Sequence, residues 1–269
     1  MIDAQLGSQV GELVRHTAAT VVLPSYQHLK ASEISEKGPG DVVTVADRRS
    51  EEVLTAGLGD LLPGSVVVGE EAYAADPSVL GRIGGGAPTW IVDPIDGTAN
   101  YAAGRGPFCL MVALVDADGL AAAWIYDPID DLMGYAVAGG GAFLDDVRVE
   151  PAAPLPADRL RGVAAATYYP ANLRANVEGG QARLGEVTAG QRCAGREYLD
   201  LIAGRQQFAM SWRTWPWDHA PGALLVREAG GVVRRLDGAE YVVAPDPGEG
   251  LLAAADDQTW ETVAAALIP

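Results

Sequence analysis

Two aspartates stand three residues apart in WIVDPIDGTANY, residues 90–101, at the point where an apolar run ends. Asp93 and Asp96 flank a proline, which limits the freedom of the backbone between them. Two carboxylates this close repel each other unless water or a cation compensates their charge. The segment therefore predicts either a solvated turn or a cation site.

An acid follows an apolar strand or opens a helix at two further places. Glu70 and Glu71 come directly after VVVG, and Asp218 opens a helical pattern in WPWDHAPG. Strand ends on one edge of a sheet converge in space, and α/β proteins build their sites there. Carboxylate oxygens on rigid elements suit Mg²⁺. The pattern indicates a magnesium site.

The residues between and after the paired aspartates add to this picture. Ile95 has a carbonyl that could serve as a ligand, and Gly97 permits the turn that brings Asp96 back towards Asp93. Thr98 would open a helix whose free N–H groups form a seat for phosphate. Two metal ions beside such a seat are the usual apparatus for in-line hydrolysis of a phosphoester.

Simpler alternatives apply to each acid taken alone. Asp96 and Asp218 also fit a turn former and a helix cap. A calcium loop of the EF-hand type fails, because the twelfth residue from Asp93 is Gly104 and not glutamate. The spacing also disfavours a D-x-D nucleophile. The match of residues 248–253 to G-x-G-x-x-G/A follows a proline-rich loop and is discounted.

Composition limits the partners and the compartment. The chain has 269 residues and a formal net charge of -17, which argues against nucleic acid and anionic membrane surfaces. Cys109 and Cys193 are the only cysteines, without C-x-x-C spacing, and are expected to be reduced and buried. The N-terminus lacks the pattern of a signal peptide, so a cytoplasmic protein is expected.

Periodicity predicts a layered α/β fold with mixed sheets and two sub-domains, 1–150 and 151–269. A proline-rich connection, EPAAPLPADR, marks the division. Residues 30–47 are polar and contain glycine and proline, and predict an exposed, mobile loop. Helices are expected at 3–30 with a kink or break at Pro24, and at 47–62, 171–178, 194–204, 218–231 and 256–267. Strands are expected at 65–71, 89–93, 107–116, 119–127, 132–139, 162–167, 207–211, 232–236 and 251–255.

Three segments in order resemble the signatures of the inositol monophosphatase family: GEE at 69–71, residues 90–101, and WPWDHAPGALLVREAGG at 215–231. KGPGDVVTVAD at 37–47 looks like the mobile loop and helix start of that family. The resemblance runs from about residue 10 to the end. It implies an α-β-α-β-α sandwich, a homodimer, a requirement for two or three Mg²⁺ ions per site, for which Mn²⁺ is a candidate substitute, and inhibition by Li⁺.

The resemblance also implies a role for individual residues. The metal ligands it implies are Glu70, Asp93, the Ile95 carbonyl, Asp96 and Asp218. The catalytic residues it implies are Asp47, Thr98 and Glu70, of which Asp47 and Thr98 orient and deprotonate the attacking water. The residues it implies around phosphate and substrate are Asp96, Gly97, Thr98, Ala194, Ser211 and Asp218.

The sequence departs from the family where the alcohol half of the substrate would bind. Ser211 falls where inositol phosphatases carry an acid, and RCAGREYLD at 192–200 replaces a Gly-Ser/Thr-Ala stretch. Arg196, Glu197 and Asp200 either compensate for the missing acid or lie on an ordinary exposed helix face.

The leading hypothesis is a Mg²⁺-dependent phosphatase acting on a small phosphorylated polyol, with inositol monophosphate as the first substrate. Within the family the alternatives are histidinol phosphate, fructose-1,6-bisphosphate and nucleotide 3'-phosphates. From another class, a regulatory or binding protein on the same fold is the alternative. The sequence retains all the acids and the threonine, and this favours an enzyme.

Overall fold

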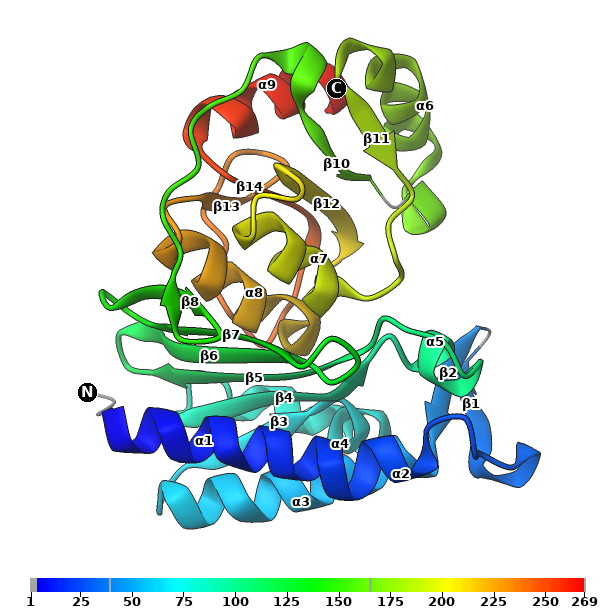
Figure 1. Ribbon diagram of the computed structural model, residues 1–269, viewed down its shortest axis with the longest axis vertical. Helices are drawn as coiled ribbons and strands as arrows, with labels where there is room; N and C mark the ends of the chain where they lie inside the picture. The colour runs from blue at the N-terminus through cyan, green and yellow to red at the C-terminus, as the bar shows by residue number, and fades with distance from the viewer. Residues whose placement is uncertain (1–3, 39, 165, 269) are drawn as a thin grey trace.

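Helices and sheets alternate along the long axis of the protein (Figure 1). The computed structural model describes residues 4–38, 40–164 and 166–268. One sheet lies between helices α1 and α3 on its outer face and α7 and α8 on its inner face, and the second sheet lies between α7 and α8 and the outer helices α6 and α9 (Figure 1). The helices of these layers are α1 (Ala4–Thr17), α3 (Val45–Leu61), α6 (Ala171–Gly180), α7 (Ala194–Ile202), α8 (Pro216–Glu228) and α9 (Asp257–Leu267). This arrangement confirms the predicted α-β-α-β-α sandwich.

The first sheet follows chain order and is antiparallel except for its first pair of strands. Its strands are β3 (Val66–Gly69), β4 (Thr89–Asp96), β5 (Cys109–Asp116), β6 (Gly119–Asp127), β7 (Leu132–Val137), β8 (Gly141–Leu144) and β9 (Val147–Arg148). The interior strand β5 is almost continuously apolar, because helices cover both faces of the sheet.

The second sheet has the order β11-β10-β12-β14-β13. Its strands are β10 (Arg161–Ala164), β11 (Glu186–Thr188), β12 (Phe208–Arg213), β13 (Val232–Arg235) and β14 (Glu249–Ala254). Strands β10, β11 and β12 run parallel, and β14 is antiparallel to both of its neighbours.

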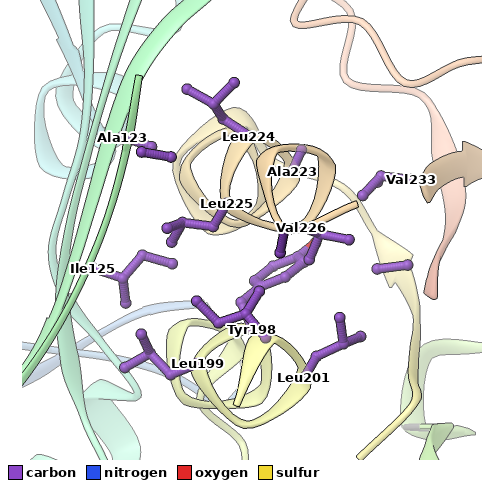
Figure 2. Packing of buried hydrophobic residues seen from close by; sticks show 14 of the residues in the cluster. Ala123, Ile125, Tyr198, Leu199, Leu201, Ala223, Leu224, Leu225, Val226 and Val233 are labelled. Atoms are coloured by element: carbon purple, nitrogen blue, oxygen red, sulfur yellow. The ribbon is translucent and has the colours of Figure 1, made fainter. Parts of the chain in front are cut away.

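One hydrophobic core joins the two sheets through α7 and α8 (Figure 2). Ile125 of β6, Leu199 of α7 and Leu225 of α8 are completely buried in it, as is Val233 of β13. Each such side chain contributes about 1.5–3 kcal/mol by burial. The predicted division near residue 150 falls between the two sheets, but this shared core crosses it and fixes α7 and α8 against both.

The segment predicted as a loop, residues 30–47, forms a hairpin instead. Strands β1 (Ile34–Gly38) and β2 (Asp41–Thr44) pair in antiparallel fashion. The β-branched residues of β2 favour an extended chain, and Gly40 takes the φ of 75° that a tight turn needs. The loop prediction was therefore wrong for β1 and β2, and helix α3 already begins at Val45.

The helix does not break at Pro24. Helical backbone continues from α1 through a π-helical turn, Ala18–Val22, into the short α2 (Leu23–Ser25), which contains Pro24 and ends before Tyr26. The hydrogen-bond pattern changes just before Pro24, because proline offers no N–H to continue the ladder. The remaining helical segments are α4 (Glu70–Ala75), α5 (Thr98–Ala102) and the 3₁₀ turns Ala31–Glu33, Pro77–Arg82, Ala157–Arg159, Ala166–Tyr168 and Gln181–Arg183. Within the described ranges, no helix is sufficiently long and apolar for a transmembrane segment.

Helix α4 begins at Glu70 because a carboxylate from α3 caps it. Glu51 accepts the N–H groups of Glu71 and Ala72, with N···O distances of 2.8 and 2.7 Å. A Cβ on Gly69 would lie 2.3 Å from this carboxylate, so a side chain there would push the cap away. Gly69 and Glu51 together fix the position of Glu70.

We expect Gly69→Ala to lower the free energy of unfolding by about 1–3 kcal/mol, because the displaced Glu51 leaves buried N–H groups without an acceptor. Urea unfolding measures this. The matched control is Gly59→Ala, where an added Cβ meets no atom within 4 Å and alanine is the better helix former. Equal stability of Gly69→Ala and wild type would contradict the role of the cap.

Candidate active site

Carboxylates from three elements gather at the C-terminal end of β4 and at the N-terminal ends of α4 and α8. Burial is the largest cause that raises the pKa of Asp93 well above its usual range, and the charges of Glu70, Asp96 and Asp218 add to it. Asp93 is 2% exposed. Burial is also the largest cause that raises the pKa of Asp218 well above its usual range, and the charges of Asp96 and Glu70 add to it. The structure thus brings together all four acids that the sequence singled out.

An irregularity in β4 places both aspartates of this strand at the site. In a regular strand, residues three apart point to opposite faces. Here Asp93 pairs with Met111 and Asp96 with Cys109, so β4 has one more residue than β5 over this stretch. The Ile95 N–H donates to Asp93 Oδ1 over 3.0 Å and stabilises the bulge.

The start of α7 holds Asp96. Its Oδ2 atom accepts the Gly195 N–H over 2.6 Å and lies 3.1 Å from Cys193 Sγ. The backbone of Gly97 and of Ala194, which adjoin Asp96 and Gly195 in sequence, lies close to the same carboxylate. Burial raises the pKa of Asp96, and its hydrogen bonds oppose the rise. Gly97 and Ala194, both predicted to contact phosphate or substrate, therefore lie at Asp96.

Only glycine fits at position 97. Its φ is 86°, and a Cβ there would lie 3.0 Å from the Pro107 carbonyl oxygen and 3.2 Å from Cys193 Cβ. The tight turn brings Thr98, the first residue of α5, back over the bulge in β4. The predicted reason for this glycine agrees with the observed backbone.

Asp47 and Thr98 form a pair beside the acids. Thr98 Oγ1 lies 3.0 Å from Asp47 Oδ1 and 2.8 Å from the Ile95 carbonyl oxygen, so its single proton serves one of two acceptors. Thr44 fixes Asp47 by donating its N–H and hydroxyl to Oδ2, over 2.9 and 2.6 Å. Burial is the main cause that raises the pKa of Asp47 to about 6. This carboxylate is therefore suited to accept a proton near neutral pH.

Lys37 brings a positive charge to the acids. Its ammonium group lies 2.7 Å from Glu70 Oε1 and 2.7 Å from Glu71 Oε1, and these carboxylates raise the pKa of the lysine although burial opposes it. Burial in turn raises the pKa of Glu70 to about 7, and the charge of Lys37 is the largest opposing cause. The hairpin thus supplies a cation where the sequence predicted a metal ion.

The donor set fits a hard divalent cation. It consists of carboxylate and carbonyl oxygens, which Mg²⁺ prefers, and their mutual repulsion would be relieved by positive charge. Over the described ranges, no three His, Cys, Asp or Glu side chains are already arranged so that they could hold an ion. Asp96 is bound to the start of α7 and Glu70 to Lys37, so ion binding requires these carboxylates to exchange partners.

The side chains considered for binding the alcohol half of the substrate form ion pairs within the protein. Arg196 binds Asp127 over 2.7 Å and Asp200 over 3.0 Å, and also contacts Asp130. Asp200 also accepts Arg205 Nε over 2.6 Å. Asp200 is buried, so the exposed-helix interpretation was wrong for it. These side chains position the start of α7.

Glu197 is also buried, and it holds the loop before α7. Its Oε1 atom accepts the Gln191 N–H over 3.0 Å. Burial is the largest cause that raises its pKa to about 7, and the charges of Asp96 and Asp200 add to it. Ser211 lies on β12 opposite Leu251 of β14, where the resemblance predicts an acid.

The ionisation of Glu197 opposes folding. Its pKa rises from 4.5 to about 7 in the folded protein, so the stability that the protonated form provides is full below about pH 4.5 and is lost as pH rises through about 7. Glu197→Gln keeps an acceptor for Gln191 and avoids this loss. We expect the variant to match wild type at pH 4 and to exceed it by up to about 3 kcal/mol at pH 8.

Urea unfolding at both pH values checks this expectation. Glu178→Gln, at an exposed position of α6, is the matched control and should show no such pH dependence. A stability difference for Glu197→Gln that is the same at pH 4 and pH 8 would show that folding does not raise the pKa of Glu197.

Several positioning residues were not predicted from the sequence. Asn100 Nδ2 donates to the carbonyls of Pro107 and Gln191, each over 2.9 Å, and so ties α5 to the loop before α7. Cys193 is free and buried as expected, but it also contacts Asp96. Asn100 stands within the quoted motif, and this was the one available signal.

Comparison with known proteins extends these observations over the whole chain. The model of the inositol monophosphatase family matches residues 5–268. An inositol-1-monophosphatase of Mesorhizobium japonicum is 34% identical over 214 residues, 77% of each chain. The Nus factor SuhB of Pseudomonas aeruginosa is 32% identical over 232 residues, 82% of each chain. The solved structure of the extragenic suppressor protein suhB from Bartonella henselae has a TM-score of 0.84 at 24% identity, and the match covers 98% of this chain and 99% of that one.

Proposed function

The chain belongs to the inositol monophosphatase family and is a phosphomonoesterase, and we propose that it hydrolyses small phosphate monoesters with Mg²⁺, inositol monophosphate being the first substrate to test. The observation that supports this most is the Asp47–Thr98 pair, which lies beside four clustered carboxylates. A proton acceptor next to a metal-binding set is what hydrolysis by water requires.

We propose that oxygen atoms of the acid cluster hold the ions. The proposed ligands are Glu70, Asp93, the Ile95 carbonyl, Asp96 and Asp218. Bound Mg²⁺ would supply an acidic water and stabilise the charge of the leaving alkoxide. Mn²⁺ has the same preference for oxygen and is a candidate substitute.

The residues of the chain orient and deprotonate the water. Asp47 is fixed by Thr44 and keeps Oδ1 for the Thr98 hydroxyl. When Thr98 donates to Asp47, its oxygen is left to accept a proton from water, which passes on to the carboxylate. The backbone of Gly97 and Thr98 would form the seat for the phosphate, and Asp96 would be among the ligands that hold the ions.

We expect Asp93→Asn to abolish activity while stabilising the metal-free fold. Loss of a shared ligand should lower phosphate release by on the order of 100-fold or more, and loss of a repelling charge should raise the thermal midpoint. Phosphate release is measured on inositol 1-phosphate and a panel of monoesters, with Mg²⁺, without it, and with added Li⁺. If wild type released no more phosphate than Asp93→Asn on any ester, the proposed activity would be wrong.

Metal binding is tested separately from turnover. Calorimetry with Mg²⁺ or Mn²⁺ should show binding that Asp218→Asn weakens by about tenfold or more, because a charged ligand becomes neutral. The matched control is Asp60→Asn on the exposed face of α3, which should bind as wild type. Unchanged affinity in Asp218→Asn would remove this residue from the site.

A second candidate function is regulatory, because one relative in the same identity range is named a Nus factor. The intact Asp47–Thr98 pair favours the enzyme, since a purely regulatory protein has no need of it. Histidinol phosphate, fructose-1,6-bisphosphate and nucleotide 3'-phosphates remain alternative substrates. The homodimer, the cytoplasmic location and the Li⁺ sensitivity are proposals that follow from the family alone.

A further inference from the structure

Arg192 has a backbone conformation that its side chain does not favour. Its φ is 59°, in the left-handed region where a Cβ crowds the backbone. Its neighbour Gln191 is held on three sides: its N–H by Glu197, its side-chain amide by Asp200 over 2.7 Å, and its carbonyl by Asn100 over 2.9 Å. The surrounding scaffold therefore imposes this conformation on residue 192.

Arg192 borders the proposed phosphate seat. Its carbonyl oxygen lies 3.3 Å from the place of a Cβ on Gly97. The next two residues, Cys193 and Ala194, both contact Asp96. Arg192 is therefore in direct backbone contact with the turn that heads α5, at the edge of the acid cluster.

Folding does not account for an arginine here. The side chain is exposed and, in the part of the chain that the structure describes, forms no ion pair, hydrogen bond or ring contact. By contrast, Arg196 and Arg205 both bind Asp200. Glycine would take the left-handed conformation without strain. An unpaired guanidinium on an unfavourable backbone is better explained by a ligand.

The exposure of Arg192 indicates which half of the substrate it meets. The acids around the scissile phosphate are buried, Asp93 at 2% and Asp47 at 0% exposure, so an exposed side chain lies further out, where the leaving alcohol would be. Guanidinium binds carboxylate and phosphate with two parallel hydrogen bonds. A cation at this position would also offset the repulsion of an anionic substrate by a chain of net charge -17.

A second arginine supports the same conclusion. Arg213 lies on β12 two residues after Ser211, on the same face of the strand. Its carbonyl is held by His219, the neighbour of Asp218, over 2.8 Å. Its exposed guanidinium stacks 3.7 Å from the ring of Tyr168 and has no carboxylate within 4.0 Å among the described residues.

We propose that Arg192 is a specificity-determining residue that binds an anionic group on the alcohol half of the substrate. The enzyme then prefers phosphate esters whose leaving alcohol carries a carboxylate or a second phosphate over esters of neutral polyols such as inositol. This proposal rests on the proposed function and names the substrate class of that site.

A matched pair of esters tests the preference. 6-Phosphogluconate and glucitol 6-phosphate have six carbons and one phosphate each, and differ in a terminal carboxylate. With Mg²⁺, wild type should show a kcat/KM about tenfold higher for 6-phosphogluconate. Arg192→Gly should remove this advantage through KM and leave glucitol 6-phosphate within about twofold. Arg192→Lys should retain part of it, and Arg183→Gln, at an exposed position without an ion pair among the described residues, should retain all of it.

Folding and turnover are controlled independently. Arg192→Gly should unfold at the same temperature as wild type or higher, because glycine suits the left-handed backbone. Calorimetry of 6-phosphogluconate with Asp47→Asn, with and without Arg192→Gly, measures binding without hydrolysis. If wild type cleaves neither ester, but 6-phosphogluconate binds and Arg192→Gly weakens that binding, this proposal would stand and the proposed function would be wrong. An equal effect of Arg192→Gly on both esters would overturn this proposal alone, and a chain that neither binds nor cleaves them would overturn both.

Discussion

The repulsion among Glu70, Asp93, Asp96 and Asp218 is the constraint that the rest of the structure must withstand. Burial and proximity both disfavour the ionised forms, so the cluster costs free energy in the absence of a cation. The protein reduces this cost locally with the ammonium group of Lys37 at Glu70. A divalent ion would add the positive charge that this single ammonium group does not supply. The acids are therefore arranged for a charge that the protein itself supplies only in part.

Such a cluster is stable only if the elements that carry it cannot move apart. The core around Leu199 and Leu225 packs α7 and α8 against both sheets, so Asp96, the start of α7 and Asp218 share one rigid support (Figure 2). Glu51 holds α4 from the other side. The bulge in β4 and the left-handed Gly97 lie next to Cys193 at the start of α7, which this core holds in place. Burial of the apolar side chains thus offsets the free-energy cost of the clustered carboxylates.

Local signals and long-range contacts explain what the sequence could and could not predict. The acids were found because each follows an apolar strand or opens a helix, and the turn at Gly97 follows from its conformational freedom. The roles of Glu51, Asn100 and Cys193 depend on partners 20 to 97 residues away, which no periodicity encodes. The β1–β2 hairpin was mistaken for a loop, because glycine and proline signal a turn without showing that the short flanking segments pair. An exposed helix face was one of two interpretations for Glu197 and Asp200, because charge usually marks such a face, whereas here they hold the strained loop before α7.

The same loop connects the two halves of the site. Asp200 and Glu197 fix Gln191, and this places Cys193 and Ala194 against Asp96 while leaving the side chain of Arg192 free. One structural device therefore stabilises a buried anion on its inner side and exposes a cation on its outer side. Under the proposed role of Arg192, an ester would approach past its exposed side chain before it meets the acids, because burial strengthens the negative potential inside and solvent weakens it outside. A substrate with charge at both ends would be oriented by this gradient, with its scissile phosphate inward only when the inner carboxylates are neutralised by ions.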